Sequence, residues 1–158
     1  MRCSAIVIFA CMVPTLVALG GATTASASDV RSIDEVISPV RSNPSCKLVE
    51  PKNPVSLQAA TLYIEDAENG DLRVGLVAKR SESYQCGKQT AVVYLYQYRD
   101  ESIARETLES MRHLIWGGKG PSSHHPEAVF GMNNVLVVVS THKPRAFVDL
   151  IRGEPEKK

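Results

Sequence analysis

The feature that most constrains this chain is an apolar N-terminal run that ends in small residues. Arg2 precedes an uncharged stretch from Ala5 to Leu19, and a Thr/Ser/Ala segment then leads to Ala27. A positive start, an apolar centre and a small-residue end are the three parts of a secretory signal peptide. We therefore expect residues 1–27 to be removed and residues 28–158 to fold as one exported domain, either periplasmic or secreted.

A membrane anchor is the alternative interpretation of the same run. A helix that spans the hydrocarbon core needs about 20 consecutive apolar residues. The run here is shorter and contains Pro14. We therefore expect no transmembrane anchor in the mature chain.

Signal removal also changes the cysteine content of the folded protein. Of the four cysteines, Cys3 and Cys11 lie in the predicted signal, which leaves Cys46 and Cys86. Two cysteines in an oxidising compartment most simply form a disulfide. We expect it to join the proline-bearing loop before the first strand to the loop that leads into the central strand. Free thiols, one of them a nucleophile, are the alternative, but nothing in the sequence indicates a low-pKa environment.

Charge narrows the class of partner. The chain has 18 Lys and Arg residues against 17 Asp and Glu residues, and loss of Arg2 makes the two sets equal. Proteins that bind nucleic acids usually carry a basic patch or an excess of positive charge. Because positive and negative residues are equal in number, we expect no nucleic-acid partner. The expected partner is an unknown protein or a component of the cell envelope.

The first part of the mature chain predicts a short helix followed by a β-hairpin. Ser32 and Glu35 have the spacing of a capping box at the start of a helix over residues 33–40. Apolar residues alternate on either side of a turn at residues 68–70. This pattern predicts two strands over about residues 60–64 and 72–78, paired through a three-residue turn.

The second part predicts a central strand and further helices. Residues 90–99 are apolar on both faces, as in a strand that is covered on both sides. Asp100 then precedes a helical repeat of apolar residues, and two short strands at 128–130 and 135–139 flank an Asn-Asn turn. Pro144 and Gly153 enclose a last helix. The expected fold is α+β: a mostly antiparallel sheet of about five strands, two to three packed helices and one disulfide.

The segment from Trp116 to Pro126 is the long loop with unusual chemistry. Its Gly-Gly-Lys-Gly run lacks the spacing of a phosphate-binding loop and follows a helix instead of preceding one. His124 and His125 remain, with His142 as a third ligand if the chain brings it close. Three imidazoles would suit a transition metal, while two solvated loop residues are the plainer interpretation.

Three tyrosines form the other candidate binding surface. Tyr94, Tyr96 and Tyr98 share one face of the predicted central strand and, with Trp116, suit an aromatic platform for a sugar or peptide. A sheet face covered by a helix is the plainer interpretation, because the same strand is predicted to be buried on both sides. We expect no catalytic residue, because no nucleophile motif relates Ser122 or Ser123 to a histidine and an acid.

The leading functional hypothesis is a non-catalytic binding or accessory protein without a cofactor. A metal-binding exported protein is the alternative, and an envelope hydrolase ranks third.

Overall fold

The computed structural model describes residues 30–50, 52–55, 57–65 and 70–154. Their helices and strands, in chain order, are α1 (Ile33–Arg41), β1 (Cys46–Val49), α2 (Leu57–Glu65), α3 (Gly70–Arg73), β2 (Leu76–Cys86), β3 (Gln89–Tyr98), α4 (Glu101–Trp116), β4 (Ala128–Met132), β5 (Val135–Ser140) and α5 (Arg145–Arg152). The predicted signal peptide and its cleavage point lie outside these residues. No helix within the described ranges is long and apolar enough to cross a membrane.

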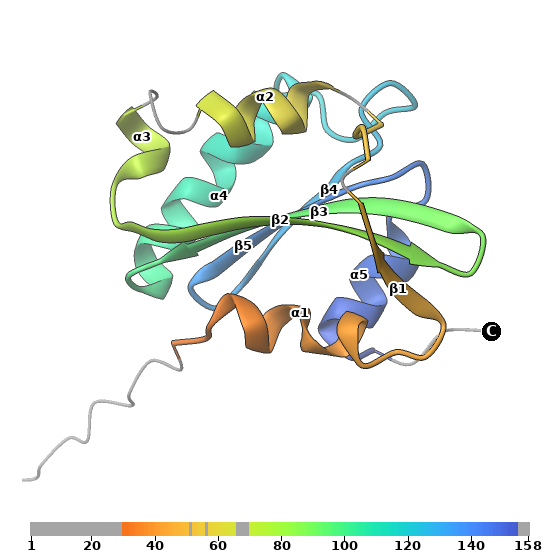
Figure 1. Ribbon diagram of the computed structural model, residues 1–158. Coiled ribbons are helices and arrows are strands. Elements are labelled where there is room, and N and C mark those ends of the chain that lie inside the picture. The colour runs from red at the N-terminus through yellow and green to blue at the C-terminus, as the bar shows by residue number, and fades with distance from the viewer. Residues whose placement is uncertain (1–29, 51, 56, 66–69, 155–158) are drawn as a thin grey trace, which may run out of the picture.

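The strands form one antiparallel sheet with the order β1-β2-β3-β5-β4. Figure 1 shows α1 and α5 on one face of this sheet and α2, α3 and α4 on the other. Two buried clusters match this layering, since one joins α1 and α5 to the sheet and the other joins the remaining helices to it. The α+β prediction, with a five-stranded antiparallel sheet and packed helices, is confirmed.

Strand β3 lies at the centre of the sheet, as its two-sided apolar pattern predicts. Its residues alternate between the two clusters: Val93 and Leu95 face α1 and α5, whereas Val92, Tyr94 and Tyr96 face α2 and α4. A strand buried on both faces needs apolar residues at consecutive positions.

The first helix begins where the sequence predicts. The Ser32 side chain accepts a hydrogen bond from the Glu35 N–H, and the Glu35 carboxylate accepts one from the Ser32 N–H. This capping box satisfies backbone donors that the first helical turn leaves unpaired. Ile33, Val36 and Ile37 then pack against the sheet.

The helices after β3 also follow their sequence signals. Asp100 caps α4 by accepting a hydrogen bond from the Ile103 N–H at 3.0 Å. The exposed side of α4 carries two ion pairs, Glu101–Arg105 at 2.8 Å and Glu109–Arg112 at 2.7 Å. Helix α5 begins after Pro144 and ends before Gly153, whose φ of 70° lies in the left-handed region that glycine adopts readily.

The predicted hairpin over residues 60–78 is wrong. Residues 57–65 form α2, in which the buried Ala59 and Leu62 recur at helical spacing. The segment Leu-Gln-Ala-Ala-Thr-Leu-Tyr-Ile-Glu contains several strong helix formers, and its apolar face can pack on α4. The same apolar residues are therefore compatible with a strand and with a helix, and the packing of this segment on α4 stabilises the helix. The turn predicted at 68–70 lies largely outside the described residues.

Two tight hairpins form instead: the predicted one across Asn133 and Asn134 joins β4 to β5, and another joins β2 to β3. Cys86 pairs with Gln89 across a two-residue loop of Gly87 and Lys88. Gly87 has a φ of 59°, and the first central position of a type II′ hairpin loop requires such a positive value.

The two edges of the sheet differ. At the β4 edge, the Arg112 guanidinium donates to the Val129 carbonyl oxygen at 3.3 and 3.4 Å. At the β1 edge, the Leu48 side chain is 66% exposed. One edge therefore has a backbone carbonyl already bonded to a side chain from α4, while the other edge strand is exposed to solvent.

Candidate binding pocket

A disulfide joins Cys46 to Cys86, as the cysteine count predicts. The two residues lie directly opposite each other in the β1–β2 ladder, with their Cα atoms 4.0 Å apart. Both are strand residues, Cys46 the first of β1 and Cys86 the last of β2, so their predicted placement in loops is wrong. The bond ties the edge strand to the sheet.

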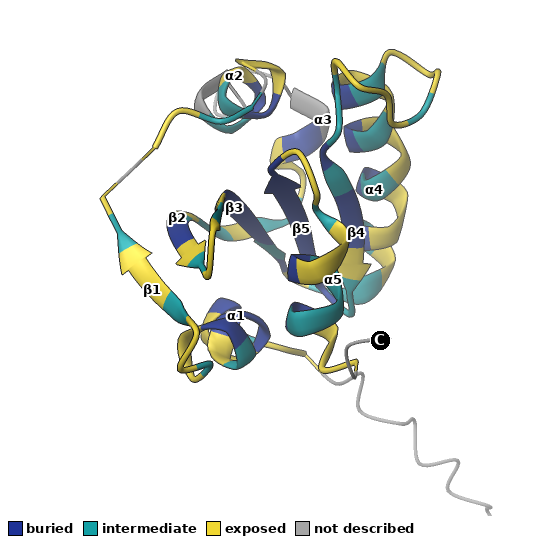
Figure 2. Cartoon of the chain, turned by 90° about the vertical axis from the view of Figure 1, so that its right-hand side faces the viewer, coloured by how far each residue is buried: buried dark blue, intermediate teal, exposed yellow. Residues whose placement is uncertain are grey.

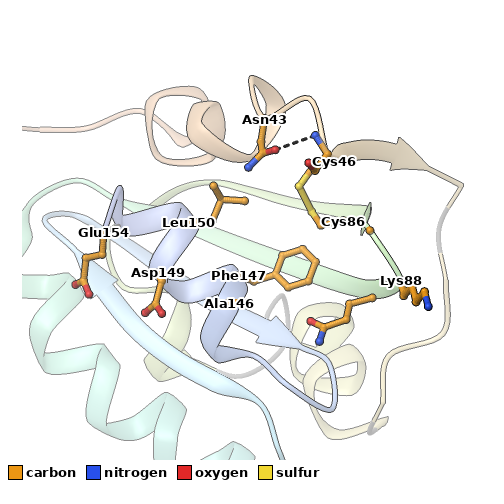
Figure 3. Close-up of a pocket in the computed structure, with 12 residues that line it drawn as sticks. Asn43, Cys46, Cys86, Lys88, Ala146, Phe147, Asp149, Leu150 and Glu154 are labelled. Atoms are coloured by element: carbon orange, nitrogen blue, oxygen red, sulfur yellow. Dashed lines mark hydrogen bonds between the residues drawn. A yellow bond between two sulfur atoms is a disulfide. The ribbon is translucent and has the colours of Figure 1, made fainter. Parts of the chain in front are cut away.

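A pocket of about 640 Å³ lies beside this disulfide, between α5 and the connection from α1 to β1 (Figure 3). Its apolar lining consists of Cys46, Cys86, Ala146, Phe147 and Leu150. Its polar lining consists of Asn43, Ser45, Lys88, Gln89, Asp149 and Glu154, with Gly87 between the two sets. Volumes between 300 and 1,000 Å³ and a largely apolar lining with few polar groups are typical of small-ligand sites.

Helix α5 forms one wall because its residues face two directions. Phe147 and Ile151 are buried against the sheet. Ala146, Asp149 and Leu150 lie on the flank of the same helix that borders the pocket. One side of α5 therefore packs on the sheet, and a neighbouring side of the same helix lines the pocket.

The opposite wall is held by backbone hydrogen bonds. The Asn43 carbonyl oxygen accepts from the Cys46 N–H at 2.9 Å, and the Asn43 Oδ1 accepts from the Ser45 N–H at 2.8 Å. An asparagine side chain that bonds two residues ahead mimics a turn. This turn directs the chain from α1 into β1 and keeps Asn43 beside the disulfide.

Charged groups of opposite sign lie at the two ends of the pocket. Figure 3 shows Lys88 at one end, Asp149 and Glu154 towards the other, and the Phe147 ring and the disulfide between them. In the described chain, the ion pairs of Asp149 and Glu154 are long contacts, to Arg145 and Arg152, each at 3.8 Å. Such exposed pairs contribute about 0 to 1 kcal/mol and leave the carboxylates accessible to other cations.

A second polar cluster lies on the same face of the sheet but holds α1 in place. Arg41 bonds to Glu82 and, at 2.7 Å, to Asp34, while Arg80 bonds to Asp34 at 2.5 Å. Burial opposes ionisation of Glu82, but hydrogen bonds from Arg41 and Tyr84 outweigh it and hold the pKa of this carboxyl below its usual range. Burial and the bond to Glu82 raise the pKa of Tyr84 to about 12. The group is internally neutralised and ties α1 to β2.

The three tyrosines considered as a platform lie inside the molecule, as the interpretation of a covered sheet face predicts. Tyr94, Tyr96 and Tyr98 are at most 4% exposed and belong to the cluster beneath α2 and α4. The Tyr63 ring of α2 packs on Tyr94 and Tyr96, with centroids 5.1 and 5.9 Å away. The Tyr98 hydroxyl donates to the Leu72 carbonyl oxygen at 3.1 Å. These residues occupy a covered sheet face and present no open surface.

The candidate metal ligands do not meet as a group. Among the residues that the structure describes, no three His, Cys, Asp or Glu side chains form a cluster that could hold a metal ion. His124 and His125 lie in the loop after α4, where the His125 N–H donates to the Ser122 Oγ at 3.2 Å, and His142 follows β5. The metal site remains a prediction for which the described chain provides no third ligand.

Trp116 and the serine candidates occupy other parts of the surface. Trp116 is half-buried at the end of α4 and lines a shallow hollow with His113 and Gly118. In the described part of the chain, no hydrogen bond joins His142 to Ser122, Ser123 or Asp149. The residues considered for a hydrolase are therefore not arranged as a triad.

The pocket itself was not predicted from the sequence. Phe147 and Leu150 belong to the last helix that Pro144 and Gly153 predict, and no sequence pattern marks them or Lys88 as pocket residues. A visible signal was the Cys-Gly-Lys sequence, because a glycine in a short connection between strands is typical of a tight hairpin and places Lys88 beside the disulfide. Nothing local indicates that α5 packs next to that hairpin.

Comparison with known proteins adds no family. The chain matches no protein-family model, and neither curated proteins nor solved structures show a significant similarity to it.

Proposed function

We propose that this chain is an exported, non-catalytic binding protein, and that the pocket beside the Cys46–Cys86 disulfide is its ligand site. The pocket carries this proposal: it has a volume of about 640 Å³ and combines apolar residues beside the disulfide with polar and charged residues around them. Sites that retain small ligands combine those features, because apolar contact supplies affinity and a few polar groups fix orientation.

Export is supported by the composition of the N-terminus and by the disulfide. The run from Ala5 to Leu19 with a small-residue end has the form of a secretory signal, and disulfides persist mainly in oxidising compartments. A binding role is supported by the separation of the pocket's charged groups, since Lys88 lies far from Asp149 and Glu154. Catalysis by proton transfer requires its groups within hydrogen-bond reach of one reacting centre.

The proposal can be tested by filling the pocket. Ala146 is exposed on the wall of α5, so Ala146→Trp places a large ring at the pocket without replacing a buried side chain. Ser110→Trp is the matched control, because Ser110 is an exposed residue of α4, on the other face of the sheet. A library of small molecules and short peptides is screened by thermal shift, since a ligand that binds only the folded state raises Tm.

We expect ligands that stabilise the unmodified protein and the Ser110→Trp variant but not the Ala146→Trp variant. Ligands that stabilise all three proteins equally would show that binding occurs elsewhere. A library without any stabilising member would contradict the proposed function.

A further inference from the structure

We infer that the ligand of this pocket is a short peptide with free ends, bound with its amino terminus near Asp149 and Glu154 and its carboxylate near Lys88. The inference rests on the proposed function and names the chemical class of the ligand. It follows from the order of charges and apolar groups along the pocket.

The end formed by the C-terminus of α5 suits an ammonium group. The Glu154 N–H donates to the Asp149 carbonyl oxygen at 2.8 Å and the Gly153 N–H donates to the Leu150 carbonyl oxygen at 3.1 Å, so the helix closes at the pocket. The C-terminus of a helix attracts cations through its macrodipole. The Asp149 and Glu154 carboxylates add two negative charges at the same place.

The opposite end suits a carboxylate. Lys88 lies in the tight β2–β3 loop and is exposed. Within the described chain it forms no ion pair, so its ammonium group is available to an incoming anion. Lysine binds such groups as a point charge with rotatable donors.

The middle of the pocket suits a peptide better than a simple alkyl chain. Ala146, Leu150 and the disulfide offer contact to apolar side chains. The side-chain amides of Asn43 and Gln89 border the same space, and each amide can pair with a peptide N–H or C=O. A peptide with apolar side chains suits both kinds of lining, whereas an alkyl chain offers no hydrogen bond to the Asn43 Nδ2 or to the Gln89 amide.

The experiment uses a pool of tripeptides with apolar side chains and free ends, titrated into the mature protein by calorimetry up to about 1 mM, where weak binding is still measurable. The same peptides are then tested with an acetylated amino terminus and, separately, with an amidated carboxyl terminus. We expect each modification to weaken binding about two- to fivefold, which corresponds to the loss of one partly exposed charge contact.

Variants assign each end of the peptide to its partner. The double variant Asp149→Asn/Glu154→Gln is expected to bind the free peptide more weakly, and acetylation of the peptide should then change its affinity very little. Lys88→Gln is expected to weaken binding of the free peptide in the same way, and amidation should then change the affinity of this variant very little. The reason is that removing both members of one contact costs little more than removing either. Glu106→Gln and Lys119→Gln, exposed charges away from the pocket, serve as controls and are expected to leave affinity unchanged.

The outcomes separate this inference from the function on which it rests. If ligands bind and Ala146→Trp blocks them, but affinity does not depend on free termini, the peptide assignment is wrong and the pocket remains a binding site. If no tripeptide binds while other molecules fill the pocket, the assignment is equally wrong. If nothing binds in a manner sensitive to Ala146→Trp, both proposals fail.

Discussion

Removal of the disulfide tests how the edge strand is held. Cys46 and Cys86 are separated by 40 residues, and the bond between them restricts the unfolded chain more than the folded one. For a loop of this length the chain-entropy relation gives about 13 cal/mol/K, or about 4 kcal/mol at room temperature. We expect the Cys46→Ala/Cys86→Ala protein to lose about this amount and to remain folded if the parent lies in the usual range of about 5 to 15 kcal/mol.

Urea unfolding followed by far-UV circular dichroism measures the difference. The slope of the free energy of unfolding against urea should also rise, because an uncrosslinked unfolded chain exposes more surface. The unmodified protein treated with a reductant is the control. Its free energy of unfolding should lie within about 1 kcal/mol of that of the double variant, because both proteins lack the disulfide. A loss below about 1 kcal/mol would refute the view that the bond is a structural staple.

Three further predictions concern the buried network, the core and the N-terminus. Glu82→Gln should lower the free energy of unfolding by about 1 to 3 kcal/mol at about pH 7, because Arg41 and Tyr84 lose a charged acceptor. Folding lowers the pKa of Glu82, so the stabilisation by its carboxylate is present above the pKa of the unfolded state and is lost as pH falls through the pKa of the folded state. Urea unfolding near pH 7 and pH 3 should therefore show a smaller difference in the free energy of unfolding between the two proteins in acid. A difference that does not change with pH would contradict the role given to the Glu82 carboxylate. Tyr98→Phe should lower the free energy of unfolding by about 1 kcal/mol, because the buried Leu72 carbonyl loses its hydrogen-bond donor. An unchanged Tm would show that this hydrogen bond does not contribute to stability. The exported chain should begin at or near Ser28, as intact mass spectrometry can determine, and a retained N-terminal segment would oppose signal removal.

Elements with strong local signals could be predicted from the sequence. The capping box of Ser32 and Glu35, the cap at Asp100 and the apolar residues of β3 each contain enough information within a few positions to define a helix start or a buried strand. The pairing of Cys46 with Cys86 followed from counting once the first two cysteines were assigned to the signal.

The segment around α2 could not be predicted from the same kind of pattern. Ala60 and Leu62 alternate with polar residues, but Ala59 and Leu62 also share a helix face. Local periodicity does not distinguish these structures over nine residues. The contact with α4 decides between them, and that contact joins residues far apart in the chain.

The candidate site was the least predictable part for a related reason. Trp116, the histidines and the tyrosines attract attention as residue types, yet the structure buries the tyrosines and leaves the histidines without a third partner in the described chain. The pocket instead combines ordinary residues from α5, the β2–β3 loop and the α1–β1 connection. Its existence depends on how α5 packs beside a hairpin, which no local pattern encodes.

The unequal edges of the sheet limit how copies of this protein can associate through their backbones. Figure 2 shows β1 at the margin of the fold with an exposed surface, whereas Arg112 already occupies the Val129 carbonyl at the β4 margin. Two copies joined at their β1 strands would present only β4 strands at both outer margins. A strand added at either outer margin would have to displace the Arg112 guanidinium from the Val129 carbonyl, which disfavours growth beyond two copies.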